Sequence, residues 1–175
     1  MSKVFLIVPG VGNSDENHWQ SLWAKKGNEF ERVEQRDWAS PVCDDWVESI
    51  EAHVAELAGK EVVLVAHSLG CLAVAHWASK TSLQVRGALL VAPPDVARVK
   101  TKHSASGFEA LPLVRLPFKS LLVASANDEY ANISKAWSYA QFWGSEFVNV
   151  GNKGHINSNS NLGDWVEGQK LLLNF

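Results

Sequence analysis

The feature that most constrains the fold is a run of five apolar residues, Val62-Val63-Leu64-Val65-Ala66. A strand with one face in water alternates apolar and polar side chains, whereas a strand buried on both faces is apolar throughout. The β-branched valines of this run favour a strand over a helix. The run therefore predicts the central strand of a sheet that helices cover on both sides.

Five further short apolar runs occur along the chain, with helical stretches between them. They are Val4–Val8, Phe30–Val33, Ala88–Ala92, Ser120–Ala124 and Glu146–Val150. Helices are expected at about 16–26, 44–57, 69–79, 133–143 and 164–173. This alternation is typical of parallel strands joined by crossover helices. We therefore expect a three-layer α/β/α sandwich, with a mostly parallel sheet of about six strands in a single domain over residues 1–175.

Charge and cysteine content exclude several functional classes. The 175 residues include 19 acidic and 16 basic side chains, a net charge of −3 without any block of like charge, which predicts no nucleic-acid or membrane partner. Cys43 and Cys71 form neither a disulfide framework nor a zinc-ligand pattern, and no metal or cofactor is expected. No apolar run is long enough for a signal peptide or a membrane span, which predicts a cytoplasmic protein.

The central strand leads directly into Ala66-His67-Ser68-Leu69-Gly70 and then into an apolar helix. A serine at such a strand-to-helix turn, with small residues two positions before and after it, matches the nucleophile elbow G-x-S-x-G. The small residues allow strand and helix to pack closely, and the turn leaves the serine Oγ exposed at the edge of the sheet. Ser68 is therefore the candidate nucleophile, and an ordinary helix N-cap is its alternative role.

An acid and a histidine follow later strands in the order that an α/β hydrolase requires. Asp128 comes after the fifth predicted strand and His155 after the sixth. This order predicts a triad in which His155 takes the proton from Ser68 while Asp128 orients the imidazole. Asp95, which follows the fourth strand, is the alternative acid.

Backbone amides from two places are expected to stabilise the charge that develops on a substrate carbonyl oxygen. One is Leu69 N–H, at the start of the helix that follows the serine. The other is Val11 N–H, in the glycine-containing loop after the first predicted strand. Residues expected near the pocket are Gly10, Gly12, His18, Trp19 and His67, with plain packing as the alternative for the last three.

Several stretches resemble the small, lidless α/β-hydrolase family that includes retinoblastoma-binding protein 9 and its bacterial relatives. They are Val8–Ser14 with His18-Trp19-Gln20 and Trp23, His67–Gly70, Ser125–Tyr130, and Gly154–Asn157 with Leu162–Trp165 and Gly168. Together they span nearly the whole chain. The resemblance implies a serine hydrolase with Ser68, Asp128 and His155 as its triad, and an abbreviated sheet without a cap domain.

One binding motif of the vertebrate member is absent. That member's tumour-suppressor binding is ascribed to an L-x-C-x-E sequence, and neither Cys43 nor Cys71 has both a Leu two positions before it and a Glu two positions after it. We therefore expect no partner of that type.

The sequence as a whole predicts a serine hydrolase that acts through an acyl-enzyme on small esters, thioesters or amides. The alternative is a protein-binding module that keeps the hydrolase fold with an unused or occluded site. The presence of all three triad residues favours the enzyme. The bond type, the oligomeric state and the conformation of the proline-rich segment 93–117 stay open at this point.

Overall fold

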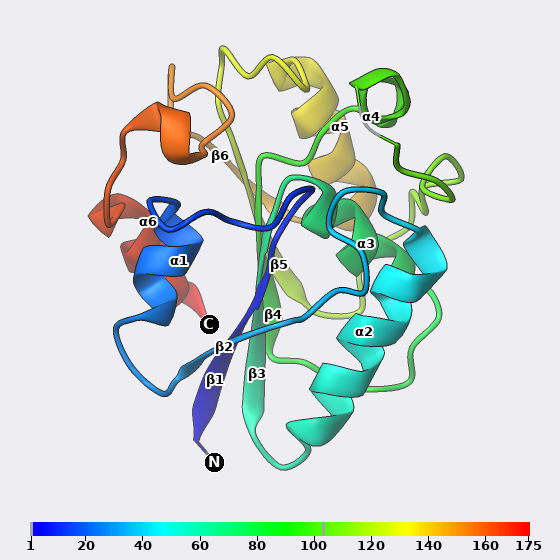
Figure 1. Cartoon of the computed structure of the whole chain (residues 1–175), viewed down its shortest axis with the longest axis vertical. Helices are drawn as coiled ribbons and strands as arrows, with labels where there is room; N and C mark the ends of the chain where they lie inside the picture. The colour runs from blue at the N-terminus through cyan, green and yellow to red at the C-terminus, as the bar shows by residue number, and fades with distance from the viewer. Residues whose placement is uncertain (1, 103) are drawn as a thin grey trace.

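Parallel strands form one central sheet, seen nearly edge-on in Figure 1. The computed structural model describes residues 2–102 and 104–175. The strands are β1 (Lys3–Val8), β2 (Phe30–Arg32), β3 (Glu61–His67), β4 (Gly87–Val91), β5 (Lys119–Ala124) and β6 (Glu146–Asn149). They lie in the order β2-β1-β3-β4-β5-β6, and each neighbouring pair is parallel. The predicted six-stranded α/β sheet is confirmed.

The apolar run 62–66 lies in β3, which pairs with β1 on one side and with β4 on the other. Four consecutive side chains of this strand, Val63, Leu64, Val65 and Ala66, have no exposed surface. Burial of a valine or leucine side chain contributes roughly 1.5–3 kcal/mol. The strand is therefore a rigid base for the turn that follows it.

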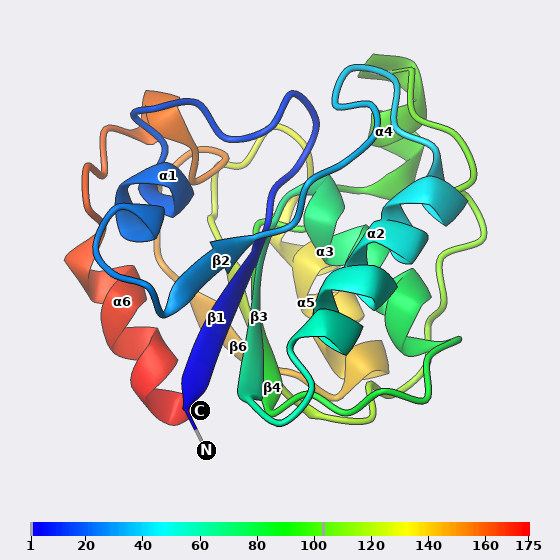
Figure 2. The ribbon, with the colours of Figure 1, turned by 60° about the horizontal axis from the view of Figure 1, so that its bottom comes forward.

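Helices cover both faces of the sheet (Figures 1 and 2). The first face carries α2 (Cys43–Glu56), α3 (Leu69–Ala78) and α5 (Ile133–Trp143), whose apolar residues form one buried cluster with the strands. The opposite face carries α1 (Trp19–Ala24), α6 (Val166–Leu171) and the 3₁₀ helix η2 (Leu172–Asn174). No helix in the described ranges is both long enough and apolar enough to span a membrane.

Two helices differ from the sequence-based expectation. α1 begins at Trp19 instead of near residue 16, because the His18 side chain caps it by accepting a hydrogen bond from Gln20 N. A further helix, α4 (Val96–Lys102), lies within the segment for which no periodicity was evident. Asp95 Oδ1 accepts a hydrogen bond from Ala97 N at 3.1 Å and so satisfies an amide at the start of this helix.

Two tryptophans of α1 connect the second face to the C-terminal part of the chain. Trp19 Nε1 donates to the Ile156 carbonyl at 2.8 Å, and Trp23 Nε1 donates to the Asp164 carbonyl at 2.7 Å. Both rings also pack against Trp165. The segment after β6, which carries His155, is therefore anchored to the core by buried contacts.

The Gly70→Ala substitution should destabilise the protein, although alanine is normally the better helix former. A Cβ at position 70 would lie 2.3 Å from Val8 O and 2.7 Å from Pro9 O, which are backbone atoms that cannot rotate away. We expect a loss of about 1–3 kcal/mol in the free energy of unfolding, measured by urea denaturation.

Gly59→Ala is the matched control, since its backbone is left-handed (φ +87°) but nothing lies within 4 Å of an added Cβ. It should lose about 1 kcal/mol from backbone strain alone. A Gly70→Ala protein that is as stable as the wild type would contradict the close approach of α3 to β1.

Candidate active site

Ser68 occupies a strained turn between β3 and α3. Its backbone has φ 53° and ψ −126°, a conformation that residues other than glycine rarely adopt. Ser68 N donates to the Val91 carbonyl of β4 at 2.9 Å, and the Ser68 carbonyl accepts from Cys71 N. The Ser68 side chain makes no capping hydrogen bond to the helix. The Ser68 hydroxyl therefore does not act as a helix N-cap, which was the alternative role for this residue.

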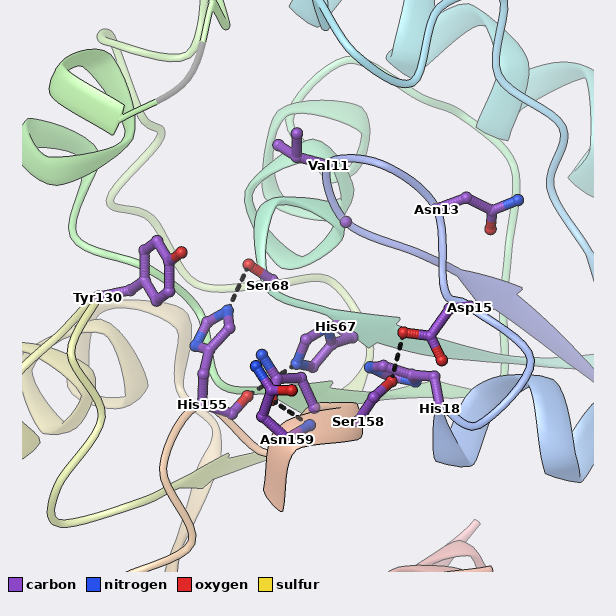
Figure 3. Close-up of a pocket in the computed structure, with 12 residues that line it drawn as sticks. Val11, Asn13, Asp15, His18, His67, Ser68, Tyr130, His155, Ser158 and Asn159 are labelled. Atoms are coloured by element: carbon purple, nitrogen blue, oxygen red, sulfur yellow. Dashed lines mark hydrogen bonds between the residues drawn. The ribbon is translucent and has the colours of Figure 1, made fainter. Parts of the chain in front are cut away.

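The structure brings Ser68, His155 and Asp128 together in one chain of hydrogen bonds. Ser68 Oγ lies 2.8 Å from His155 Nε2 (Figure 3). On the other side of the ring, His155 Nδ1 lies 2.9 Å from Asp128 Oδ2 and 3.0 Å from Asp128 Oδ1. Both His155 and Asp128 are buried. Such an arrangement can move a proton from the hydroxyl to the imidazole while the carboxylate stabilises the cation.

Loop contacts hold the acid and the histidine in register. Asn127 Oδ1 accepts a hydrogen bond from Gly154 N at 2.7 Å, and Ser125 Oγ accepts one from Lys153 N at 2.8 Å. The loop after β5 is thereby joined directly to the loop after β6. The carboxylate of Asp128 is also oriented by its own loop, because Tyr130 N donates to Oδ1 at 2.8 Å.

Asp95, the alternative acid, has different partners. Its carboxylate accepts from Ala97 N and lies 3.8 Å from Lys135 Nζ. The carboxylate on His155 Nδ1 belongs to Asp128.

The loop after β1 passes directly over the serine turn. A Cβ added to Gly10 would lie 2.9 Å from Ser68 Cβ and 3.4 Å from Leu69 N, so glycine is needed for this approach. Within the described residues, neither Val11 N nor Leu69 N donates a hydrogen bond to a protein acceptor. The two amides predicted to face an oxyanion thus belong to two segments that pack against one another, the loop after β1 and the start of α3.

His67 is not placed to act as the base, because its hydrogen bond goes to a backbone carbonyl. Its Nε2 lies 2.9 Å from the backbone carbonyl of His155, to which the ring N–H donates. Burial is the main cause that lowers the pKa of His67 well below its ordinary value, so the ring is neutral at pH 7. The neutral His67 ring thus supports the backbone of His155, the histidine of the predicted triad.

His18 is also a buried neutral histidine. Its Nδ1 accepts a hydrogen bond from Gln20 N at 3.2 Å, and burial lowers its pKa to about 4. The ring contacts the His67 ring with 4.7 Å between centroids. Asp15 lies nearby, where its Oδ2 accepts a hydrogen bond from Ser158 Oγ at 2.7 Å (Figure 3).

A cavity of about 230 Å³ opens next to Ser68 and His155. It is lined by Gly10, Val11, Asn13, Asp15, His18, His67, Ser68, Tyr130, His155, Asn157, Ser158 and Asn159. The predictions for Gly10, His18 and His67 thus agree with the lining. Within the described ranges, no residue of segment 93–117 lines this cavity.

Two residues expected near the pocket lie outside its lining, so those expectations need correction. Gly12 turns away with φ +76°, and its N–H donates to the Trp38 carbonyl at 2.8 Å. Trp19 is buried against Trp23 and Trp165 in the core. Adjacent side chains at the start of a helix point in different directions, so His18 reaches the cavity while Trp19 does not.

Sequence reasoning missed six polar residues of the cavity: Asn13, Asp15, Tyr130, Asn157, Ser158 and Asn159. Tyr130 follows Asp128 by two positions, and its ring lies 4.3 Å from the His155 ring between centroids. Its position in the loop after the fifth strand was a signal that could have identified it. Ser158 and Asn159 depend on the 3₁₀ helix η1 (Ser158–Ser160), which has no periodic signature. Among the described residues, no group of three or more His, Cys, Asp and Glu is arranged to hold a metal.

This chain is similar to one known protein family and to several solved structures. A family model described as serine hydrolase matches residues 5–174. The solved structure of a YdeN-like hydrolase from Pectobacterium atrosepticum is 33% identical, with a TM-score of 0.89 over 99% of this chain and 90% of that chain. The ydeN gene product from B. subtilis is 21% identical, with a TM-score of 0.71 over 99% of this chain and 98% of that chain.

More distant structures share the fold. Est1E from Butyrivibrio proteoclasticus, solved with ferulic acid bound, is 12% identical, with a TM-score of 0.72 over 98% of this chain and 88% of that chain. At this identity the likeness concerns the fold alone. No curated protein matches the sequence of this chain.

The buried neutral state of His18 predicts a loss of stability in acid. A pKa that folding lowers means that the unfolded chain binds the proton first, so stability falls as the pH drops below about 6.5 towards about 4. We expect His18 to contribute about 2 kcal/mol to the decrease in unfolding free energy between about pH 7 and about pH 4.5.

His18→Asn is the variant that isolates this contribution, because an Asn oxygen can still accept the Gln20 N–H at the start of α1. Urea denaturation at both pH values should show a smaller decrease for the variant than for the wild type. Equal decreases in the two proteins would show that His18 is not the group that titrates.

Proposed function

The chain belongs to the serine hydrolase family, and we propose that it hydrolyses small acyl compounds through a covalent acyl-enzyme on Ser68. The observation that carries the proposal is the chain of hydrogen bonds from Ser68 through His155 to Asp128, with 2.8 Å between Oγ and Nε2. This chain lies at the wall of an open cavity, where a substrate can reach the hydroxyl.

In the first step, Ser68 Oγ attacks the carbonyl carbon of the substrate while His155 Nε2 takes its proton. Asp128 holds the imidazole in the tautomer that leaves Nε2 free to accept, and it stabilises the imidazolium that forms. Leu69 N–H and Val11 N–H are the proposed donors to the oxyanion, each of which would contribute about 10²–10³ in rate.

In the second step, the carbonyl-to-leaving-group bond breaks and His155 returns the proton to the leaving group. A water molecule then attacks the acyl-enzyme, with His155 again as the base, and the acid is released as Ser68 regains its proton. Gly10 supports this chemistry because its missing side chain lets the Val11 loop lie against the serine turn.

The alternative of a protein-binding module with an unused site remains a second prediction from the sequence. The open cavity beside Ser68 favours the enzyme, because an occluded site would leave no room for a substrate.

A fluorophosphonate probe tests the proposed nucleophile directly, since it phosphonylates serines that a histidine activates. The wild type should be labelled on Ser68 and the Ser68→Ala variant should not. Absence of labelling in a folded wild-type protein would refute the proposal and favour the binding module.

Asp128→Asn should lower kcat by about 10⁴, because an amide at this position favours the wrong imidazole tautomer. Steady-state hydrolysis of p-nitrophenyl acetate measures the effect. Asp95→Asn is the matched control, since Asp95 faces Lys135 and α4 instead of His155. A larger loss of kcat in Asp95→Asn than in Asp128→Asn would show that Asp95 is the acid and that the proposed role of Asp128 is wrong.

A further inference from the structure

The cavity beside Ser68 adjoins a second one on the far side of His155. The second cavity measures about 390 Å³ and shares His155, Asn157 and Asn159 with the first. We propose that together they form a polar groove that binds a short-chain acyl ester of a neutral polyhydroxylated alcohol, such as a sugar or glycerol. This inference rests on the proposed function and specifies the substrate class of the same site.

The first cavity is too small and too polar for a long acyl chain. Its volume of about 230 Å³ is below the roughly 300–1,000 Å³ of pockets that enclose drug-sized ligands. Val11 carries the one aliphatic side chain among the described residues that line it. A long alkyl chain would cover the Asp15 carboxylate and the Asn159 amide, which both line this cavity, and would offer them no hydrogen bond in place of water. An acetyl group or another short acyl group fits these walls.

The charges around the groove disfavour an ionic substrate. Asp15 carries a carboxylate in the first cavity, and the hydrogen bond from Ser158 is the main cause that lowers its pKa. No lysine or arginine is found among the described residues that line this cavity, and Arg32 lies behind the lining, where its Nη1 donates to Asn13 Oδ1. The Asp15 carboxylate in the wall therefore disfavours an anionic acyl group. In the second cavity Glu129 and Lys153 have opposite charges. The second cavity therefore suits a neutral group.

Amide side chains are the dominant polar groups of the second cavity. Asn127, Asn152, Asn157 and Asn159 all line it. A primary amide offers both donors and an acceptor, and a hydroxyl group likewise donates and accepts. Asn127 and Asn157 already accept backbone N–H groups through Oδ1, which leaves their amide N–H groups to donate to a ligand. Together with the Asn152 and Asn159 amides, they match a ligand that carries several hydroxyl groups, whereas an alkyl or aromatic alcohol offers them no acceptor beyond its ester oxygens.

Asn159 is the residue best placed to contact such an alcohol. Its side chain is exposed and lies at the junction of the two cavities, near His155 in Figure 3. Its backbone is held in place, because its N–H donates to Asn157 Oδ1 at 3.1 Å and its carbonyl accepts from Asn161 Nδ2 at 3.4 Å. In the described part of the chain its side-chain amide makes no hydrogen bond, which leaves that amide for a ligand.

The chemistry assigns the two halves of the ester to the two cavities. The acyl group is transferred to Ser68 Oγ and stays beside the serine, in the small first cavity. The ester C–O bond breaks, and the alcohol oxygen receives the proton that His155 took from Ser68. The alcohol therefore leaves past His155, where the second cavity begins.

Two matched substrate series test the proposal by kcat/KM. In the acyl series, p-nitrophenyl acetate should exceed p-nitrophenyl octanoate by at least about tenfold. In the alcohol series, 6-O-acetylglucose should exceed cyclohexylmethyl acetate by at least about tenfold, since the two esters share a ring and a primary leaving oxygen and differ in their hydroxyl groups. A preference for octanoate, or equal rates for the two acetates, would overturn the proposal.

Variants at position 159 test whether the groove causes the preference for the sugar ester. Asn159→Leu should reduce the ratio of sugar ester to cyclohexyl ester by about tenfold, whereas Asn159→Gln, which keeps the amide, should retain most of it. Asn28→Leu is the control, because Asn28 is exposed in the turn before β2 and lines neither cavity. A ratio is insensitive to a general loss of folded protein. An unchanged ratio in Asn159→Leu would remove Asn159 from the proposed contact.

Failure of this inference can be told apart from failure of the proposed function. An enzyme that reacts with fluorophosphonate at Ser68 but prefers octanoate is a serine hydrolase with a different substrate class. A folded wild type that neither reacts with the probe nor hydrolyses any of the four esters contradicts the proposed function itself.

Discussion

The strained backbone of Ser68 is the constraint on which the rest of the site depends. Its φ of 53° and ψ of −126° cost of order 1–3 kcal/mol, and the surroundings must offset that cost. They do so through β3, which is buried on both faces, through the bond from Ser68 N to Val91 O, and through the contact of Gly70 with the β1 backbone. A glycine at each of positions 10 and 70 is required for the same reason, because the chain passes too close there for any side chain.

The remaining parts of the site come from loops that lie far apart in the sequence, and polar contacts hold them together. Asn127 and Ser125 join the acid loop to the histidine loop, while His67 donates to the His155 carbonyl from below. A buried neutral histidine suits this purpose because its ring can donate without carrying a charge that burial would penalise. Some of these groups also make the walls polar, since His67 lines the cavity beside Ser68 and Asn127 lines the neighbouring one.

The sequence predicted the sheet, and the three residues of the proposed triad lie within hydrogen-bond distance in the structure, whereas half of the residues that line the cavity were not predicted. Runs such as Val62–Ala66 predict their strand because burial on both faces dictates an apolar composition. The turn at Ser68 is predictable because its geometry demands small neighbours. By contrast, α4 is a short helix in a segment without periodicity, and whether His18 or Trp19 faces the cavity depends on where α1 begins. Asn159 depends on a 3₁₀ turn that only tertiary contacts define.

In the proposed enzyme, the absence of a cap over the described residues places selectivity and catalysis in the same loops. In an enzyme with a separate cap, substrate contacts can change while the triad stays fixed. Here the segment that carries His155 continues directly into Asn157, Ser158 and Asn159, so most substitutions there would disturb the histidine as well. Asn159 is an exception, because its backbone bonds keep the turn in place whichever side chain it carries. In the proposed enzyme, substrate preference can therefore change at this position without a change in the proposed proton transfer from Ser68 to His155.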